Sequence, residues 1–226
     1  MSKRIFVSAT NTNIGKTYTS TLLVGALSRM GLRVGVYKPI ETGVTAIAPD
    51  GNTLFQAALS FNPELASLTL NDIVTLQLPL PAAPFIANEG KKIDLSFFDA
   101  ALAKIEALCD VVIIEGAGGL MVPIDDDRMM IDLPRHFHAV TLLVTHCNLG
   151  CINDTLLSIN ALETAALPYV WGLNCRSEDT DFEIVSLPYF NHRFENIYRI
   201  EKDIDAIAKA LLDTISSTNE ERLCNT

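Results

Sequence analysis

The chain has 226 residues, of which 49% are hydrophobic, so it can bury a large core, and we expect one domain. Its formal net charge of -10 disfavours a nucleic-acid partner, because most of the surface would repel phosphates. No stretch approaches the ~18 continuous apolar residues of a membrane span, and the apolar run near the N-terminus is too short for a signal peptide. We therefore expect a cytoplasmic protein that binds neither nucleic acid nor a membrane.

The cysteines point to the same compartment. There are five of them, an odd number, and they show no C-x-x-C spacing, which favours reduced thiols. Cys147 and Cys151 stand four residues apart, but no second pair completes the ligand set of a zinc site. We expect free thiols and no structural zinc.

Short runs rich in β-branched residues alternate along the chain with longer amphipathic stretches. The runs predict strands at residues 5–9, 34–38, 111–115, 140–145 and 169–174. The stretches predict helices at residues 17–30, 54–60, 95–108, 153–166 and 203–215. This alternation is typical of right-handed crossovers, and it predicts a doubly wound α/β fold with a mostly parallel sheet and helices on both faces.

The domain organisation follows from the same pattern. We expect residues 1–215 to form one domain and the polar residues 216–226 to form a mobile tail. The proline-rich section 39–88 is expected to form loops and short helices inserted over the active edge of the sheet.

The first expected strand is joined to the first expected helix by a loop that ends in Gly15-Lys16-Thr17. The order of strand, loop and helix is that of the phosphate-binding pattern G-x-x-x-x-G-K-[ST]. In such a loop the N–H groups and the helix N-terminus attract anionic oxygens, while Lys16 would reach the outer phosphates and Thr17 would ligate Mg²⁺. Thr10 replaces the first glycine, so the loop requires Thr10 at negative φ; a left-handed threonine would cost about 1–2 kcal/mol.

Two charged residues follow expected strands at the edge where the loop lies. Lys38 could neutralise charge on a transferred phosphoryl group, although in isolation it would be a solvated lysine at a strand end. Glu115 follows four apolar residues, where a carboxylate needs a partner. Phosphate-bound Mg²⁺ would be such a partner, and the alternative is a cap formed by N–H groups of the glycines that follow. A third feature, the turn at residues 149–153, could bind a carboxylate at a helix start, but alone it is an ordinary strand-to-helix turn.

These motifs occur together in the order and spacing of one family. On the loop, Lys38-Pro39 with Thr42-Gly43, the run from Glu115 to Gly119, and the turn at 149–153, the chain resembles the dethiobiotin synthetases. The resemblance covers residues 3 to about 190. It implies a homodimer of P-loop NTPase-type domains whose active site is completed across the interface.

The resemblance also implies a reaction. Such an enzyme carboxylates 7,8-diaminopelargonate with CO₂, phosphorylates the carbamate with ATP in the presence of Mg²⁺, and closes the ring to give dethiobiotin, ADP and phosphate. By this resemblance Lys38 and Lys16 would be the catalytic residues, and Thr17 and Glu115 would hold Mg²⁺.

The remaining contacts are also implied by the resemblance. The nucleotide would be bound by Thr12, Asn13, Ile14, Gly15, Lys16, Thr17, Glu115, Gly116, Ala117, Gly118, Asn174, Pro188, Tyr189 and Phe190. In this set Asn174 would read the adenine and residues 188–190 would line the base. The small substrate would be bound by Thr12, Thr42, Leu149, Gly150, Cys151 and Asn153.

One position departs from the family pattern and leaves a choice open. By loop length after Gly43, Thr53 stands where the family carries an aspartate that assists the metal, and Asp50 is the nearest acid. Either Asp50 takes that role through a shifted loop, or the metal relies more on Glu115 and phosphate oxygens.

Two other functions remain open on the sequence alone. A P-loop switch or partitioning ATPase would act through a protein partner, but such proteins commonly carry a second lysine in the loop, and residues 10–14 contain none. A non-catalytic module with a decayed loop would account for Thr10 and Thr53.

Overall fold

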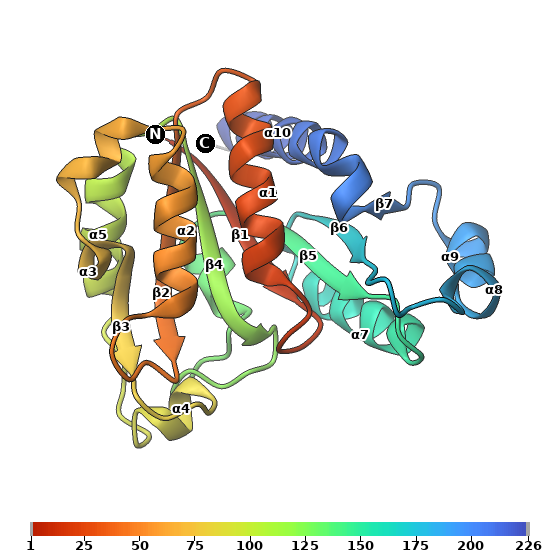
Figure 1. The fold of residues 1–226 in the computed structure, drawn as a ribbon, viewed down its shortest axis with the longest axis horizontal. Coiled ribbons are helices and arrows are strands. Elements are labelled where there is room, and N and C mark those ends of the chain that lie inside the picture. The colour runs from red at the N-terminus through yellow and green to blue at the C-terminus, as the bar shows by residue number, and fades with distance from the viewer. Residues whose placement is uncertain (1, 225–226) are drawn as a thin grey trace.

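The protein is built on one parallel sheet (Figure 1). The structure is a computed structural model and describes residues 2–224. Each pairing between neighbouring strands is parallel. Across the sheet the order is β3 (Val74–Leu78), β2 (Val34–Thr42), β4 (Val111–Gly119), β1 (Lys3–Ala9), β5 (Val140–His146), β6 (Tyr169–Asn174) and β7 (Tyr198–Arg199). The predicted doubly wound α/β fold is confirmed.

Helices cover both faces of the sheet. On one face α1 (Lys16–Arg29) packs beside α2 (Pro49–Leu59) and α10 (Ile200–Cys224), as Figure 1 shows. The right-handed connections place α5 (Ser96–Glu106), α6 (Asp132–His136) and α7 (Cys151–Thr164) on the other face. The shorter elements are η1 (Pro63–Ser67), α3 (Leu70–Ile73), α4 (Pro84–Ala87), α8 (Phe182–Val185) and α9 (Leu187–Arg193).

The buried core follows the strands. Residues 111–114 of β4 are 0% exposed, as expected for a central strand covered on both faces. A second apolar cluster lies under α7 and α9, where Trp171 of β6 contacts the rings of Phe190 and Phe194. Strands β5 and β6 contribute to both clusters, because successive side chains of a strand point to opposite faces: Leu142 belongs to the first cluster and Leu143 to the second.

Three expectations about the elements need correction. The section 39–88 is not only loops and short helices, because it contributes the edge strand β3, which pairs with β2 at Ile40 and Leu76. The short elements α6 and β7 were not predicted, because they have too few residues to show a period. The last helix continues nine residues past the expected end at 215, so the start of the expected tail is helical as far as Cys224.

The cysteine expectation also fails in part. Cys147 and Cys175 form a disulfide, with Cα atoms 4.9 Å apart, whereas Cys109 and Cys151 are free and buried. The register of the strands explains this link. His146 at the end of β5 pairs with Asn174 at the end of β6, so the next residues, Cys147 and Cys175, also lie opposite each other. Their separation of 28 residues gave no local signal of this pairing.

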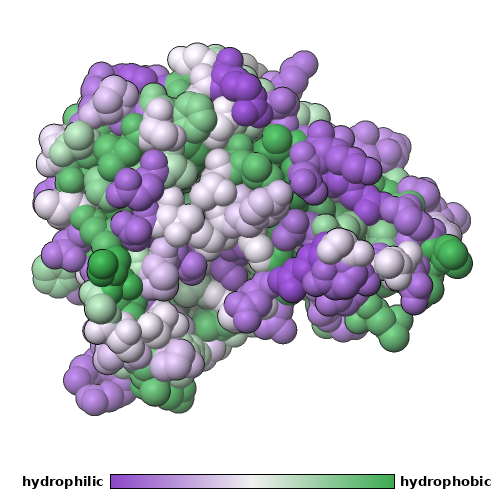
Figure 2. Space-filling view, viewed as in Figure 1, coloured by the Kyte–Doolittle hydropathy of each residue, from purple (hydrophilic) through white to green (hydrophobic). Residues whose placement is uncertain are grey.

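Two surface observations complete the fold. Within residues 2–224 no helix is long and apolar enough to span a bilayer. Figure 2 shows apolar surface at the end of the molecule where Figure 1 places α8, and there Ile184 is 82% exposed.

Candidate active site

The candidate site is an open cavity of about 890 Å³ at the carboxyl ends of β1, β2 and β4. This is the edge where ligands bind in open parallel sheets. The lining residues come from six segments of the chain, and they are Thr12, Asn13, Gly15, Lys16, Thr17, Tyr18, Lys38, Glu41, Thr42, Asp50, Pro81, Ala82, Ala83, Pro84, Ala117, Gly118, Val122 and Arg176. Nine of the predicted site residues are therefore brought to one cavity.

The backbone of the phosphate loop meets the condition set by Thr10. The non-glycine residues with positive φ do not include Thr10, and its N–H donates to Val144 O at 3.0 Å. The left-handed positions are Asn13 (φ 60) and Gly15 (φ 102). Asparagine tolerates that conformation better than most residues, so the variant loop forms without a glycine at position 10.

The end of β6 holds this loop in place. Asn174 Nδ2 donates to Ile14 O at 2.7 Å, and the guanidinium of Arg176 donates to Asn13 O. A Cβ at Gly15 would lie 2.2 Å from Asn174 Nδ2, so this position needs glycine for close approach as well as for its φ. Asn174, predicted to read a base, thus also fastens the loop.

Behind the loop, three donors converge on the fully buried carboxylate of Glu115. Lys38 Nζ lies 2.7 Å from Glu115 Oε1, and Thr17 Oγ1 donates to the same oxygen at 2.9 Å. Ser20 Oγ donates to Glu115 Oε2 at 2.8 Å. The predicted catalytic lysine and both predicted metal ligands therefore meet in one network, and the alternative of a glycine N–H cap for Glu115 is not needed.

The two lysines of the cavity differ in their electrostatics. Burial and the nearby Lys38 ammonium lower the pKa of Lys16 to about 8. Burial also opposes the charge on Lys38, but Glu115 and Asp50 outweigh it and raise the pKa of Lys38. Lys38 therefore keeps its charge through its carboxylate partners, whereas Lys16 is the cation that an incoming phosphate would stabilise.

The strand-end glycines shape the cavity floor. Gly116 O accepts a hydrogen bond from Lys38 Nζ at 3.4 Å, while Ala117 and Gly118 line the cavity. Gly118 has φ 69, and a Cβ there would lie 2.7 Å from Val122 Cγ2. Thr42 also lines the cavity.

Asp50 and Thr53, the two residues compared for the metal-assisting role, lie in different places. Asp50 lines the cavity, with Oδ2 3.5 Å from Lys38 Nζ. Thr53 is exposed, and its hydroxyl donates to Pro49 O at 2.8 Å within α2. Asp50, in the first turn of α2, is the acid that lies at the site. It precedes Thr53, the position that loop length indicated, by about one helical turn.

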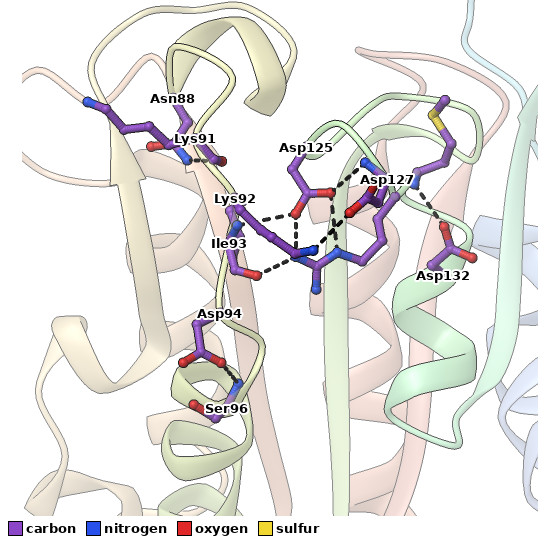
Figure 3. Close-up of polar contacts among 11 residues, drawn as sticks. Asn88, Lys91, Lys92, Ile93, Asp94, Ser96, Asp125, Asp127 and Asp132 are labelled. Carbon is purple, nitrogen blue, oxygen red and sulfur yellow. Dashed lines mark hydrogen bonds and ion pairs between the residues drawn. The ribbon is translucent and has the colours of Figure 1, made fainter.

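A salt-bridged cluster holds the segment that follows α4. Asp125 is 3% exposed, and it accepts N–H groups of Ile93 and Asp127 at 3.2 Å each. Arg128 binds both Asp125 and Ile93 O, and Lys92 lies 2.9 Å from Asp127. Figure 3 shows Lys92 and Ile93 beside Asp125 and Asp127. The cluster ties this segment to the loop after β4.

The predicted substrate turn lies away from this cavity. Gly150 (φ 100) begins α7, and Leu149 is 86% exposed, whereas Cys151 is buried. Neither the turn nor Asn153 lines the cavity within the described chain. The substrate-binding role of the turn therefore stays a prediction, as does the second subunit through which the resemblance would bring it to the site.

The structure buries Phe190, one of the three residues 188–190 predicted to line the base, whereas the role of Pro188 and Tyr189 stays a prediction. Phe190 is 0% exposed and packs against Trp171 and Phe182 in the second apolar cluster. Pro188 and Tyr189 are exposed on α9, and neither lines the cavity. An aromatic residue that follows a strand is as well suited to core packing as to stacking on a base, and here packing accounts for Phe190.

Three residues of the site were not predicted. Ser20 follows Lys16 by one helical turn, so its burial beside Glu115 could have been inferred from helix periodicity. Arg176 is placed by the tertiary contact of β6 with the loop. Glu41 stands near the end of a buried strand at 3% exposure, and a carboxylate in such a place was a signal of a specific partner.

Comparisons with known proteins identify the family of this chain. The family model described as an AAA domain matches residues 3–207. The ATP-dependent dethiobiotin synthetase of Sulfurovum is 40% identical over 207 residues, which cover 92% of this chain and 99% of that protein. The chain belongs to the dethiobiotin synthetase family. The synthetase of Wolinella succinogenes is 34% identical across 94% of this chain and all of its own length, and that of Helicobacter pylori is 39% identical across 85% and 91%.

Solved structures support the fold of this dethiobiotin synthetase family member. The Aquifex aeolicus MinC:MinD cell division complex matches with a TM-score of 0.51 at 15% identity, over 100% of this chain and 96% of the other. Cobyrinic acid a,c-diamide synthase of Mycobacterium smegmatis matches with a TM-score of 0.51 at 16% identity, over 94% and 93%. At these identities the likeness concerns the P-loop fold and not the activity.

Proposed function

We propose that this protein carboxylates 7,8-diaminopelargonate with CO₂ and closes the product to dethiobiotin, with ATP converted to ADP and phosphate. The observation that carries the proposal is the Lys38–Glu115–Thr17 network directly behind a phosphate loop. The printed names of the family members supply the reaction, and the network supplies the groups that such a reaction needs at a phosphoryl group.

The chemistry needs positioned charge more than a protein nucleophile. One amine and CO₂ form a carbamate, whose oxygen attacks the γ-phosphorus while ADP leaves with the bridging electron pair. The second amine then attacks the carbamoyl carbon, loses its proton, and expels phosphate. Lys16 and Lys38 stabilise charge on the transferring phosphoryl group, because both ammonium groups line the same cavity.

The residues present fit Mg²⁺. Thr17 Oγ1, Glu115 and Asp50 offer only oxygen donors, which is the ligand type that this cation prefers. We propose that Thr17 and Glu115 hold the ion and that Asp50 assists through the outer side of the cavity. When bound, Mg²⁺ would neutralise phosphate charge and orient the oxygens of the β- and γ-phosphates.

The small substrate is assigned to the part of the cavity beside Thr12 and Thr42. Both residues line the cavity, and their hydroxyl groups can donate hydrogen bonds. We also propose that the protein is a homodimer and that the turn at 149–153 of the second subunit binds the substrate carboxylate. The exposure of Leu149 supports this arrangement, because the turn is open to a second copy.

Nucleotide recognition is assigned to the loop and to the end of β6. Asn13, Ile14 and Gly15 present the loop backbone, and Asn174 lies beside it. We propose that Asn174 reads adenine with the part of its amide that does not bind Ile14. Arg176, at the cavity wall, replaces residues 188–190 as the neighbour of the nucleotide in this proposal.

The direct test is incorporation of labelled CO₂ into a cyclic urea. Purified protein is incubated with ATP, MgCl₂ and labelled bicarbonate, with and without diaminopelargonate, and the product is identified by mass. Incorporation that needs all components supports the proposal. ATP hydrolysis that is indifferent to both small substrates would contradict it and would favour a switch ATPase.

A further inference from the structure

The carboxylate of Glu41 is almost completely buried at the end of β2, with an exposure of 3%. Both of its oxygens accept backbone hydrogen bonds from the first turn of α2. Asp50 N donates to Oε1 and Gly51 N donates to Oε2, each at 2.9 Å. A side chain of the central sheet therefore serves two N–H groups of a helix that begins eight residues later in the chain.

Helix α2 has no local substitute for this contact. Its N-cap position is Ala48, which has no side chain that could accept a hydrogen bond, and Pro49 opens the helix. The first N–H groups of any helix lack partners within the helix, so they need an acceptor from elsewhere. Glu41 supplies that acceptor, and its negative charge also suits the positive end of the helix.

The approach of the helix to the strand is close. A Cβ at Gly51 would lie 2.0 Å from Val74 Cγ2 and 3.1 Å from Glu41 Oε2. Glycine at position 51 therefore permits the helix start to sit against β3 and against the Glu41 carboxylate. With the two hydrogen bonds, this contact fixes the backbone of Asp50 relative to the strand that carries Lys38.

We propose that Glu41 is a positioning residue for the metal site, which acts by holding the backbone of Asp50 so that the Asp50 carboxylate faces Lys38 and the phosphate-bound Mg²⁺. This inference rests on the proposed function and assigns it a residue that the family motifs do not contain. Asp50 Oδ2 lies 3.5 Å from Lys38 Nζ, and the Asp50 side chain is 50% exposed into the cavity. An aspartate so open to solvent has little packing of its own, so its direction depends on the backbone that Glu41 holds.

The two acids thus have different tasks. Glu41 is buried and its oxygens are engaged by N–H groups, whereas Asp50 faces the cavity. Removal of an outer partner of a metal ligand typically costs 10–100-fold in metal affinity. The substitution Glu41→Gln barely changes the shape of the side chain. It places an amide NH₂ group where one carboxylate oxygen now accepts a backbone hydrogen bond, so two donors would face each other.

The test measures binding of ATP to the full-length protein by calorimetry, over a series of MgCl₂ concentrations and in EDTA. For E41Q we expect a rise of about tenfold in the MgCl₂ concentration that gives half of the full effect of MgCl₂ on ATP binding. The ATP affinity in EDTA should stay within twofold of wild type. For D50N we expect a rise of at least the same size. The exposed T53A on the same helix is the matched control and should behave as wild type.

The double variant separates the possible roles. If Glu41 acts through Asp50, E41Q/D50N should need no more MgCl₂ than D50N alone, within twofold. Additive effects would overturn the proposal and would make Glu41 a direct ligand. A lower melting temperature of E41Q with unchanged MgCl₂ dependence would also overturn it, because that result belongs to a merely structural cap.

The outcomes also distinguish this inference from the proposed function. ATP binding by wild type that ignores MgCl₂ would refute the metal role itself. A normal E41Q beside a defective D50N would refute only the role of Glu41. If E41Q does not accumulate as folded protein, E41D answers the same question, since it keeps the charge but draws the oxygens back by one methylene group.

Discussion

The carboxyl edge of the sheet contains two regions that differ in how their polar groups are satisfied. At β1, β2 and β4 lies a charged region, made of Lys16, Lys38, Glu41, Asp50 and Glu115, in which ammonium, carboxylate, hydroxyl and backbone groups bind one another. At β5 and β6 lies an apolar region, made of the strand ends with α7, α8 and α9, which is held by aromatic packing and a disulfide.

One chain supplies the phosphate-binding groups of the charged region. It does not bring the predicted substrate-binding turn or the buried Phe190 to the cavity. In the charged region Lys38, Glu41 and Glu115 have partners, whereas Lys16 has no ion pair among the described residues and is left to bind an incoming phosphate. In the apolar region the predicted substrate turn is exposed and the predicted base-lining Phe190 is buried. We therefore expect substitutions in the charged region to change catalysis, and substitutions in the apolar region to change stability or assembly.

The largest effect is expected for Lys38→Ala. The variant should lose about 10²–10³ in kcat, with ATP affinity changed far less, because Lys38 stabilises charge that develops at the phosphoryl group. It should also lose about 3–5 kcal/mol of stability, because Glu115 would be left buried without its cation. Steady-state kinetics, calorimetry and denaturant unfolding measure the three quantities.

The control for Lys38 is the double variant Lys38→Ala with Glu115→Gln. Without the unpaired charge of Glu115, the double variant should regain most of the lost stability, while its turnover stays low. Normal turnover of Lys38→Ala would show that the charged region is structural and would remove the main distinction between the two regions.

The next largest effect is expected for Phe190→Ala in the apolar region. The ring is fully buried against Trp171 and Phe194, so its loss should cost about 3–5 kcal/mol in the free energy of unfolding. ATP affinity of the folded variant should stay within twofold of wild type. Tyr189→Ala, on the same helix but 38% exposed, should lose much less stability. A tenfold loss of ATP affinity with stability intact would instead restore the base-lining role of Phe190.

A comparable but smaller loss is expected for Cys175→Ser. The disulfide closes a separation of 28 residues, and loss of such a link costs about 3–4 kcal/mol by the loop-entropy estimate. Unfolding of wild type with and without a reductant should show the same difference, and the variant should be insensitive to the reductant. Equal stability of wild type in both conditions would mean that strand pairing, and not the covalent link, holds this region.

The smallest effect on stability is expected for Leu149→Ala. The side chain is 86% exposed, so the free energy of unfolding should change by no more than about 0.5 kcal/mol. If the turn completes the site of a second subunit, the variant should dissociate more readily in sedimentation and show a raised KM for the diamine. An unchanged KM in a monomeric enzyme would show that one chain suffices.

The contrast between the regions also explains what could be predicted from the sequence. The strands and the phosphate loop were recognisable because their requirements are local: β-branched runs, a glycine at positive φ, and a lysine and threonine at a helix start. Lys38 and Glu115 could be placed at the same edge in advance, because parallel strands end there, but their ion pair was not predicted.

The features that were missed depend on neighbours distant in the chain. Strand β3 is short and takes its place from the register with β2. The Cys147–Cys175 link comes from the register of β5 with β6, and the cap that Glu41 gives to α2 comes from a helix packed on a strand. None of these leaves a period or a spacing that one segment could show.

The contact between Gly15 and Asn174 has a consequence for how this protein can vary. Any side chain at position 15 would collide with the Asn174 amide, and any larger residue at 174 would press on the loop. Because Gly15 also has φ 102, position 15 needs glycine whatever residue stands at 174. The loop glycine thus limits which residues the end of β6 can carry, although almost the whole domain separates the two positions along the chain.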